Sequence, residues 1–248
     1  MRVALVTGSG RERIGWHVAD ALAERGWGIA VHYHTSGDDA RGTVESLAAR
    51  GVQARAFQAD LSDQAAVDRM LAQVLERFGH VDALVNCAAI WKRKRLEDVT
   101  AADVREHFEI NTLGTFLCCQ KIGLTMAKQP AGGVIVNLGD WAERRPYLDY
   151  AAYFPSKGAI IALTRSMAVE LASRNPRVRV NCVLPGPVML PHDLPEAERS
   201  RAIEATLVRH EGSPKNVVQA VLYLIDNDFV TGDCIAVDGG RSIWAGGS

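Results

Sequence analysis

The sequence predicts an α/β fold in which helices cover both faces of one parallel, doubly wound sheet. Short apolar runs of strand length alternate with segments whose apolar residues recur at helical spacing, along most of the 248 residues. The first run leads directly into a glycine-containing turn and a helical pattern, which is the opening of a dinucleotide-binding unit. We therefore expect one domain that covers residues 1–248 without an internal linker.

Seven strands and about six helices follow from this alternation. Strands are predicted at residues 3–7, 28–34, 52–58, 83–87, 134–138, 178–184 and 235–237. Helices are predicted at residues 14–25, 38–50, 67–78, about 101–128, 153–171 and 214–226. Three of these helices end at a glycine, namely Gly26, Gly51 and Gly79, which is a common helix stop.

One stretch, at about 186–212, breaks this rhythm. It carries Pro187, Pro191 and Pro195 and then a charged helix that begins at Glu196. An insertion after the carboxyl end of a strand is where an α/β enzyme places a movable cover over its substrate. We expect a substrate lid here, and the alternative is an ordinary surface excursion.

Composition limits the classes of partner. The chain is 48% hydrophobic, and 28 basic and 29 acidic residues leave a formal net charge of −1, which does not favour nucleic-acid binding. Its five cysteines are scattered, without Cys-x-x-Cys pairs or zinc-like spacing, so reduced thiols and no metal site are expected. No apolar run has the length of a membrane span or a signal peptide. These features predict a soluble, cytoplasmic protein.

The pair Tyr153 and Lys157 carries potential acid–base chemistry. If Tyr153 opens a helix, Lys157 lies one turn later on the same face. A nearby cation stabilises a phenolate, so we expect Lys157 to lower the pKa of Tyr153 toward the working pH. The alternative is an amphipathic side chain beside a solvated lysine.

The first turn and the end of the second strand predict a cofactor. Glycines between Thr7 and Gly15 let backbone N–H groups approach a pyrophosphate at the start of a helix. The segment from His32 to Ser36 contains no acid that would hold a ribose 2′-hydroxyl, whereas histidine and hydroxyl donors such as His34 and Ser36, with arginines nearby, suit a 2′-phosphate. NADPH is the cofactor that this pattern favours.

Several motifs in this order resemble those of the short-chain dehydrogenase/reductases over essentially the whole chain. They are Thr7-Gly8 to Gly15, Asp60-Leu61, Asn86-Cys87-Ala88-Ala89, Asn111, Tyr153-x-x-x-Lys157, Asn181 to Pro185-Gly186, and Asp238-Gly239-Gly240. The resemblance implies a Rossmann-type fold, nicotinamide hydride transfer and a homotetramer.

The same resemblance assigns roles to residues. It implies that Tyr153 donates a proton, that Lys157 binds the nicotinamide ribose, that Asn111 holds a water linked to Lys157, and that Asp60 contacts the adenine. The expected cofactor-binding residues are Gly8, Arg11, Arg13, Ile14, Gly15, His34, Thr35, Ser36, Asp60, Leu61, Asn86, Ala88, Tyr153, Lys157, Pro185, Gly186 and Val188.

The chain also departs from the general family pattern. Asp140 stands where the family usually has a serine that hydrogen-bonds the substrate carbonyl, and a carboxylate cannot donate unless it is protonated. Arg13 replaces an expected glycine, Leu190 an expected threonine, and the first turn is one residue longer than usual. These departures put routine ketone reduction in doubt.

Three features are similar to the pteridine reductase branch: Arg13, the segment from His32 to Ser36, and Asp140. That branch also has an aromatic residue near the position of Trp91, but it has a basic residue where Thr35 stands. This resemblance implies that a pterin stacks between Trp91 and the nicotinamide, with Arg13 reaching both cofactor and pterin. Arg13, Trp91, Asp140 and Tyr153 are then the expected substrate-binding residues, and Asp140 joins the catalytic group.

Alternatives remain for the function and for single residues. The chain could reduce a keto group on an acyl, sugar or steroid-like substrate, or it could be a regulator that binds NADPH without catalysis. Trp91 could be a packing residue, and Asp140 could be a helix cap. The basic run from Lys92 to Arg95 could be a solvated loop, a nucleic-acid or targeting patch, or an attractor for an anionic tail such as the glutamate of a folate.

Overall fold

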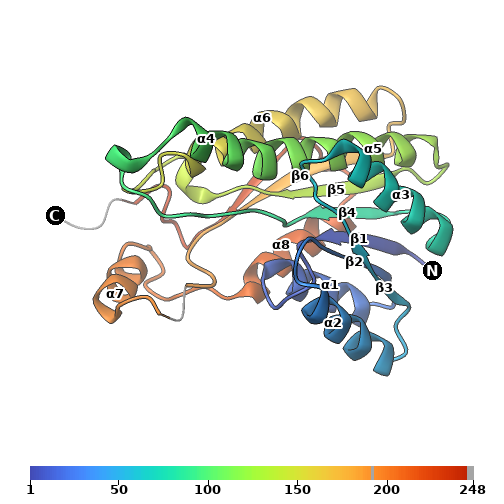
Figure 1. Ribbon diagram of the computed structural model, residues 1–248, viewed down its shortest axis with the longest axis horizontal. Coiled ribbons are helices and arrows are strands. Elements are labelled where there is room, and N and C mark those ends of the chain that lie inside the picture. Colours follow the sequence, from blue (N-terminus) through green and yellow to red (C-terminus); the bar gives the residue numbers. More distant parts are fainter. Residues whose placement is uncertain (191–192, 245–248) are drawn as a thin grey trace.

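The computed structural model describes residues 1–190 and 193–244, which form a single α/β domain around a seven-stranded parallel sheet (Figure 1). The strand order is β3-β2-β1-β4-β5-β6-β7. The strands are β1 (Val3–Thr7), β2 (Gly28–Tyr33), β3 (Ala54–Gln58), β4 (Ala83–Asn86), β5 (Gly133–Leu138), β6 (Val178–Pro185) and β7 (Cys234–Val237). Each predicted strand is present, and its ends differ from the prediction by no more than two residues.

Helices cover both faces of the sheet, as the alternating pattern predicted (Figure 1). One face carries α3 (Gln64–Phe78), α4 (Ala101–His107), α5 (Gly114–Lys128) and α6 (Tyr153–Ala172), and the other carries α1 (Ile14–Glu24), α2 (Gly37–Ala49) and α8 (Pro214–Asp226). Successive side chains of β1 divide between the two cores: Ala4 and Val6 pack with α1 and α8, and Leu5 packs with α3 and α5.

The helix predicted at about 101–128 is not continuous, which corrects the sequence-based expectation. A π-helical segment, η2 (Phe108–Leu113), separates α4 from α5. Two of its side chains contact α6, because Asn111 donates to the Ser156 hydroxyl and Thr112 donates to the Ser156 carbonyl. Single π-helical turns of this kind occur frequently at functional sites. Apolar periodicity cannot reveal such a turn, because the apolar pattern of the sequence continues on both sides of the π-helical segment.

The predicted lid contains α7 (Glu196–Glu204), which stands apart from the two helical layers (Figure 1). None of its residues is buried. Pro191 and His192, which belong to the predicted lid, lie outside the described residues. The segment follows the carboxyl end of β6, as expected from the sequence. Its movement over a substrate stays a prediction.

Two further observations concern the apolar character of the helices and the state of the thiols. Within residues 1–190 and 193–244, no helix is both long enough and apolar enough to cross a membrane. All five cysteines are free thiols. Cys118, Cys119 and Cys182 are buried, and burial raises the pKa of the Cys118 and Cys119 thiols, so these groups are protonated and unreactive at neutral pH.

Candidate active site

A cavity of about 770 Å³ lies where the carboxyl ends of β5 and β6 meet the start of α6. Its wall contains Leu138, Gly139 and Asp140 after β5, and Tyr153 and Lys157 from α6. The backbone from Pro185 to Leu190, which follows β6, forms another side. In open α/β sheets, ligands bind in the crevice outside the carboxyl ends of the strands. The cavity therefore lies where the fold places a ligand.

Tyr153 and Asp140 are in direct contact. The Tyr153 hydroxyl donates a hydrogen bond to Oδ2 of Asp140 at 2.8 Å. The other carboxylate oxygen, Oδ1, accepts from the backbone N–H of Ala142 at 2.8 Å and so caps the short 3₁₀ helix η3 (Trp141–Glu143). The two interpretations of Asp140, as a helix cap and as a site residue, are thus compatible, because each oxygen has its own partner.

Lys157 lies one turn after Tyr153 on α6, as predicted, and is buried. Its ammonium donates to the carbonyl oxygen of Leu138 at 2.7 Å. Burial lowers the pKa of Lys157, and the nearby Asp140 partly offsets this effect. The carbonyl and the negative charge of Asp140 together hold the ammonium at the base of the cavity.

The expectation that Lys157 lowers the pKa of Tyr153 is wrong for this structure. Burial raises the pKa of Tyr153 well above its usual value, and the carboxylate of Asp140 raises it further. Burial also raises the pKa of Asp140, because the charged form loses its hydration. Burial first, and then a negative neighbour rather than the lysine, therefore determine the pKa of the phenol, and both groups retain protons more firmly than they would in water.

The glycine-rich turn fits a nicotinamide dinucleotide. Gly8 has a φ of 65°, and a Cβ there would lie 2.9 Å from the Ala88 Cα. A Cβ on Gly15 would lie 2.8 Å from the Gly8 carbonyl oxygen. The N-terminus of α1 has no side-chain cap and no acid in its first turn, so its N–H groups can meet a pyrophosphate. Ile14, at the start of α1, lines the cavity, which joins this turn to the Tyr153 region.

His32 hydrogen-bonds to the glycine-rich turn. Its Nδ1 accepts a hydrogen bond from the Gly8 N–H at 3.0 Å, and its Nε2 lies 3.1 Å from the Ala59 carbonyl, to which it donates in this tautomer. Burial lowers the pKa of His32 to about 4, so the ring is neutral at pH 7. His32 is therefore a structural residue of the turn, and His34, Thr35 and Ser36 remain the predicted 2′-phosphate residues of this segment. His32 lies within β2 and is buried, whereas His34 follows the end of that strand and is exposed.

The predicted 2′-phosphate residues lie around the end of β2, and acids lie among them. Arg11 forms an exposed ion pair with Asp39 at 3.5 Å, and Nε2 of His34 lies 3.9 Å from Oδ2 of Asp60. The exposed Thr35 precedes Ser36, which begins α2 without a side-chain capping bond, so the Ser36 hydroxyl remains available. Arg11 must exchange a carboxylate for a phosphate if it binds the cofactor.

Other predicted residues have structural partners. Ser62 hydrogen-bonds to Asp60 and lowers the pKa of that carboxyl. Leu61 is buried against Gly114, so only its backbone can face a ligand. Asn86 donates to Asn137 at 2.9 Å, and its buried Oδ1 has no partner among the described residues. Pro185, Gly186 and Val188 line the cavity, whereas Arg13 is exposed and is not among the lining residues described.

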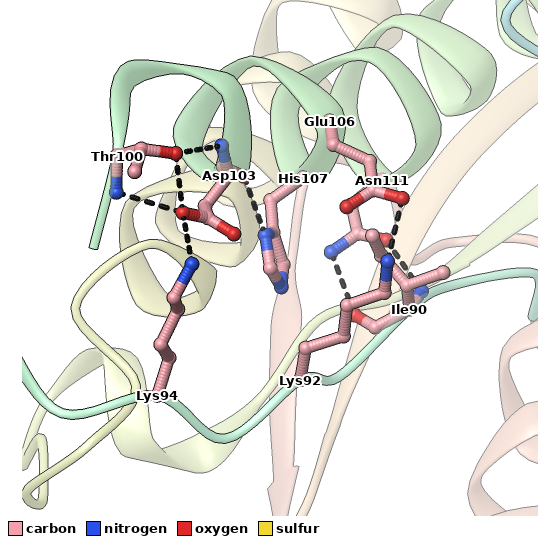
Figure 2. Close-up of polar contacts among 8 residues, drawn as sticks. All are labelled: Ile90, Lys92, Lys94, Thr100, Asp103, Glu106, His107 and Asn111. Atoms are coloured by element: carbon pink, nitrogen blue, oxygen red, sulfur yellow. Dashed lines mark hydrogen bonds and ion pairs between the residues drawn. The ribbon is translucent and has the colours of Figure 1, made fainter. Parts of the chain in front are cut away.

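Asn111 joins the loop after β4 to α6, and Figure 2 shows its contact with Ile90 in that loop. Its Oδ1 accepts from the Ile90 N–H at 2.8 Å, and its Nδ2 donates to the Ile90 carbonyl and the Ser156 hydroxyl, both at 3.0 Å. Ser156 immediately precedes Lys157 in the chain. The side chain of Asn111 thus connects Ile90 to the residue before Lys157. Its predicted water-holding role stays a prediction.

The basic run from Lys92 to Arg95 is neutralised locally. Lys92 contacts Glu106 at 2.6 Å and Lys94 contacts Asp103 at 2.7 Å, both on α4 (Figure 2). Arg93 pairs with Asp149 and Arg95 with Asp98, both at 2.9 Å. Because every base in the run has its own carboxylate, the ion pairs favour the solvated-loop interpretation over attraction of nucleic acid or of an anionic tail.

Sequence reasoning assigned no role to an aromatic cluster in the cavity wall. Trp91 stacks on Tyr150, with ring centroids 4.8 Å apart and planes within 6°. Tyr147 contacts Tyr150 edge-on at 5.1 Å and stacks on Trp141 at 6.1 Å. Trp91, Trp141, Tyr147 and Tyr150 all line the cavity. The density of aromatic residues between 141 and 154 was the signal, but only the fold brings Trp91 to them.

Comparisons with known proteins agree with this geometry. A family model described as enoyl-(acyl carrier protein) reductase matches residues 9–242. The 3-oxoacyl-(acyl-carrier-protein) reductase FabG of Staphylococcus epidermidis is 34% identical, with 96% of this chain and 97% of that protein covered. The (2S)-((R)-hydroxy(phenyl)methyl)succinyl-CoA dehydrogenase subunit BbsD of Thauera aromatica is also 34% identical, with 99% and 98% covered.

Solved structures extend the similarity to the fold. A putative short-chain alcohol dehydrogenase from Sinorhizobium meliloti has a TM-score of 0.90 at 31% identity, with 98% of this chain and 97% of that chain covered. The acetoin dehydrogenase of Enterobacter cloacae has a TM-score of 0.87 at 33% identity, with 98% and 96% covered. The similarity therefore extends over almost the whole chain.

Proposed function

The chain belongs to the short-chain dehydrogenase/reductase family and is an oxidoreductase; from this premise, we propose that it uses NADPH to reduce a keto group on a substrate with a flat portion. The observation that carries the proposal is the hydrogen bond between Tyr153 and Asp140 in the cavity wall, with the Lys157 ammonium buried at the base. This arrangement supplies an acid, a second proton store and a fixed cation within one site.

Residues of this chain would hold NADPH along the carboxyl edge of the sheet. Gly8, Gly15 and the uncapped start of α1 receive the pyrophosphate, and Asp60 receives the adenine. Lys157 and Tyr153 hold the nicotinamide ribose. The remaining proposed contacts are Arg11, Arg13, His34, Thr35 and Ser36 at the 2′-phosphate, and Ile14, Leu61, Asn86, Ala88, Pro185, Gly186 and Val188 along the dinucleotide. Bound NADPH supplies the hydride, from nicotinamide C4.

The proton reaches the substrate through Tyr153. Its hydroxyl turns from Asp140 to the substrate carbonyl oxygen and donates the proton that completes the alcohol. The resulting phenolate oxygen lies 2.8 Å from Oδ2 of Asp140, and Asp140 in its protonated form returns a proton to it and becomes a carboxylate. A carboxyl group is a much stronger acid than a phenol, so this transfer is downhill. A protonated Asp140 can also donate to the carbonyl oxygen, as the family's serine does.

The names of the relatives favour a keto group as the reacting function. FabG is named for reduction of a 3-oxoacyl group, and the structural neighbour from Enterobacter cloacae is named for acetoin. The BbsD subunit is named for a substrate with a hydroxyl beside a phenyl ring. The cluster of Trp91, Trp141, Tyr147 and Tyr150 offers aromatic surface to such a flat group. The non-catalytic alternative is set aside, because the family and the intact Tyr153 and Lys157 support an enzyme.

A second candidate is reduction of a dihydropterin ring, which Asp140 favours. A carboxyl beside Tyr153 matches the ring nitrogens of a pterin, and Trp91 offers a stacking surface. Tyr150 already covers one face of Trp91, so a pterin would use the opposite face. Arg13 is exposed, and it must move toward the cavity to contact a pterin. We rank this candidate second for these reasons. We also propose that the protein forms the homotetramer implied by the family and that it is cytoplasmic.

A turnover screen tests the proposal. Purified protein is given diacetyl, acetoacetyl-CoA, several aryl ketones, dihydrobiopterin and dihydrofolate, each with NADPH and with NADH. We expect at least one ketone to be reduced with NADPH at a kcat/KM well above those of the pterins. The reverse ranking would establish the second candidate, and turnover of none of these compounds would count against both.

A further inference from the structure

Arg241 lies in the wall of the cavity that contains Tyr153. It follows the turn formed by Asp238, Gly239 and Gly240. The buried Asp238 carboxylate accepts hydrogen bonds from the N–H groups of Gly240 at 2.9 Å and Ser242 at 2.7 Å, on either side of Arg241. The backbone of Arg241 is thus fixed by a buried acid, and its side chain is presented to the cavity from a defined point.

The Arg241 guanidinium stacks on the aromatic cluster. Its central carbon lies 4.7 Å from the centroid of the Trp141 ring, and Trp141 stacks in turn on Tyr147. Stacking covers one face of a guanidinium but leaves its N–H edge available to a planar acceptor. The edge of Arg241 is therefore the polar end of an aromatic surface that extends to Tyr147.

No carboxylate forms an ion pair with Arg241 within the part of the chain that the structure describes, although the charge of Asp238 raises its pKa. The one hydrogen bond of its guanidinium to these residues goes from Nη1 to the carbonyl of Ala202 on α7. Arg201, the neighbour of Ala202, also lines the cavity, and its Nε donates to the Ala197 carbonyl of its own helix. Arg93, another lining arginine, is instead paired with Asp149. Burial lowers the pKa of Arg241, an effect that an anionic partner would reverse.

Glu198, on α7, is an acid whose negative charge opposes the positive charges of the arginines in this cavity. It lines the cavity from the preceding turn of the helix. Its charge acts on Arg93 and on Tyr150, and it forms no ion pair with Arg201 or Arg241 among the described residues. A cap of α7 by Arg241 would use only the Nη1 donor that binds Ala202. Capping therefore accounts for one donor of Arg241 and leaves its other guanidinium N–H groups without a hydrogen-bond partner among the described residues.

We propose that Arg241, assisted by Arg201, binds a carboxylate of the substrate, so that the site prefers oxo acids whose flat portion lies along Trp141 and Tyr147. The assignment rests on the proposed keto-group reduction, with the carbonyl at Tyr153 and the carboxylate at the other end of the molecule. A bidentate carboxylate matches the planar fork of a guanidinium, and neutral analogues would leave that fork unsatisfied.

The test compares acids with their carboxamides, which have the same shape without the charge. The probes are 4-acetylbenzoate, 4-acetylphenylacetate and the two corresponding amides, and both Kd by calorimetry and kcat/KM with NADPH are measured. The proteins are the wild type, Arg241→Gln, Arg201→Gln and the control Arg144→Gln. Arg144 is an exposed arginine paired with Glu143 and is not among the cavity residues described. Arg201→Gln leaves the contact between Arg241 and α7 intact, and circular dichroism checks the folding of each variant.

We expect the wild type to bind at least one acid about tenfold or more tightly than its amide. Arg241→Gln should abolish this preference, Arg201→Gln should reduce it, and Arg144→Gln should leave it unchanged. Equal binding of acid and amide by the wild type, or a preference that survives in both cavity variants, would overturn the carboxylate site. Acid binding that depends on Arg241 without turnover of any probe would retain the site and count against ketone reduction, so the two failures are distinguishable.

Discussion

The Tyr153 hydroxyl donates to Oδ2 of Asp140 at 2.8 Å, while the Lys157 ammonium one turn away donates to the Leu138 carbonyl. The phenol is therefore coupled to a half-buried carboxyl. Burial raises the pKa of both Asp140 and Tyr153, and each of these groups is a proton donor in the proposed reduction. Asp140 stands where the family usually has a serine, and its carboxyl group must be protonated before it can donate a hydrogen bond.

Replacement of the phenolic oxygen should stop catalysis and spare cofactor binding. We expect Tyr153→Phe to lower kcat by about a hundredfold or more, because the acid in contact with the substrate is lost. The Kd for NADPH, measured by fluorescence titration, should change little, since one hydroxyl among many contacts is removed. Wild-type turnover by this variant would exclude Tyr153 as the proton donor.

The end of β2 should select the cofactor. We expect a higher kcat/KM with NADPH than with NADH, and a reduction of that preference by about tenfold in Arg11→Ala, because a charge-assisted hydrogen bond is lost. Arg41→Ala is the matched control, since Arg41 is an exposed arginine on α2 that pairs with Asp38. Equal use of the two cofactors by the wild type would show that Asp39 and Asp60 cancel the phosphate site.

Trp91 should act in substrate binding. We expect Trp91→Ala to raise KM several-fold with a smaller effect on kcat, because an aromatic surface contributes about 0.5–1.5 kcal/mol beyond its buried area in both ground and transition states. Trp91→Phe should retain part of the effect. Leu96→Ala, at an exposed position in the same loop, serves as the control. A KM for Trp91→Ala equal to that of the wild type would assign Trp91 to packing alone.

His32 should make stability depend on pH. Its pKa is lowered to about 4 in the folded protein, so between pH 6.5 and pH 4 the unfolded chain binds a proton that the folded protein does not. The contribution of His32 to the free energy of unfolding is therefore fully present above pH 6.5. It decreases by about 3 kcal/mol as pH falls toward 4.

Urea unfolding at pH 7 and pH 4 measures this loss. The wild type should lose about 3 kcal/mol more than His32→Asn, which cannot titrate. His34→Asn, at the exposed position two residues later, should behave as the wild type does. An equal loss in the wild type and in His32→Asn would remove His32 as the cause.

The fold was predictable because each strand and most helices carry their own local pattern. Parallel strands buried on both faces are continuous apolar runs, and glycines mark several helix ends. The π-helical turn at Asn111 was not predictable, because it depends on tertiary hydrogen bonds to Ile90 and Ser156. The local sequence pattern does not encode such tertiary contacts.

The site was predictable where its residues share one element. Tyr153 and Lys157 lie one turn apart on α6, and Asp140 reaches them from the end of the neighbouring strand β5. The sign of the pKa shift of Tyr153 was not predictable, because burial and the distance to Asp140 decide it. Arg241 was missed for the same reason, since 100 residues separate it from Trp141 in the chain.

A protonated Asp140 should take the place of the family's serine in ketone reduction. The measurement that checks this role is kcat/KM against pH, for the best ketone of the screen, in the wild type and in Asp140→Ser. Because burial raises the pKa of Asp140, wild-type activity should fall about tenfold per pH unit once pH exceeds that raised pKa. Asp140→Ser, whose hydroxyl donates at every pH, should lack this decline and keep or increase its ketone activity, while turnover of dihydropterins falls. The same decline in Asp140→Ser, or loss of its ketone activity with pterin turnover intact, would contradict the account.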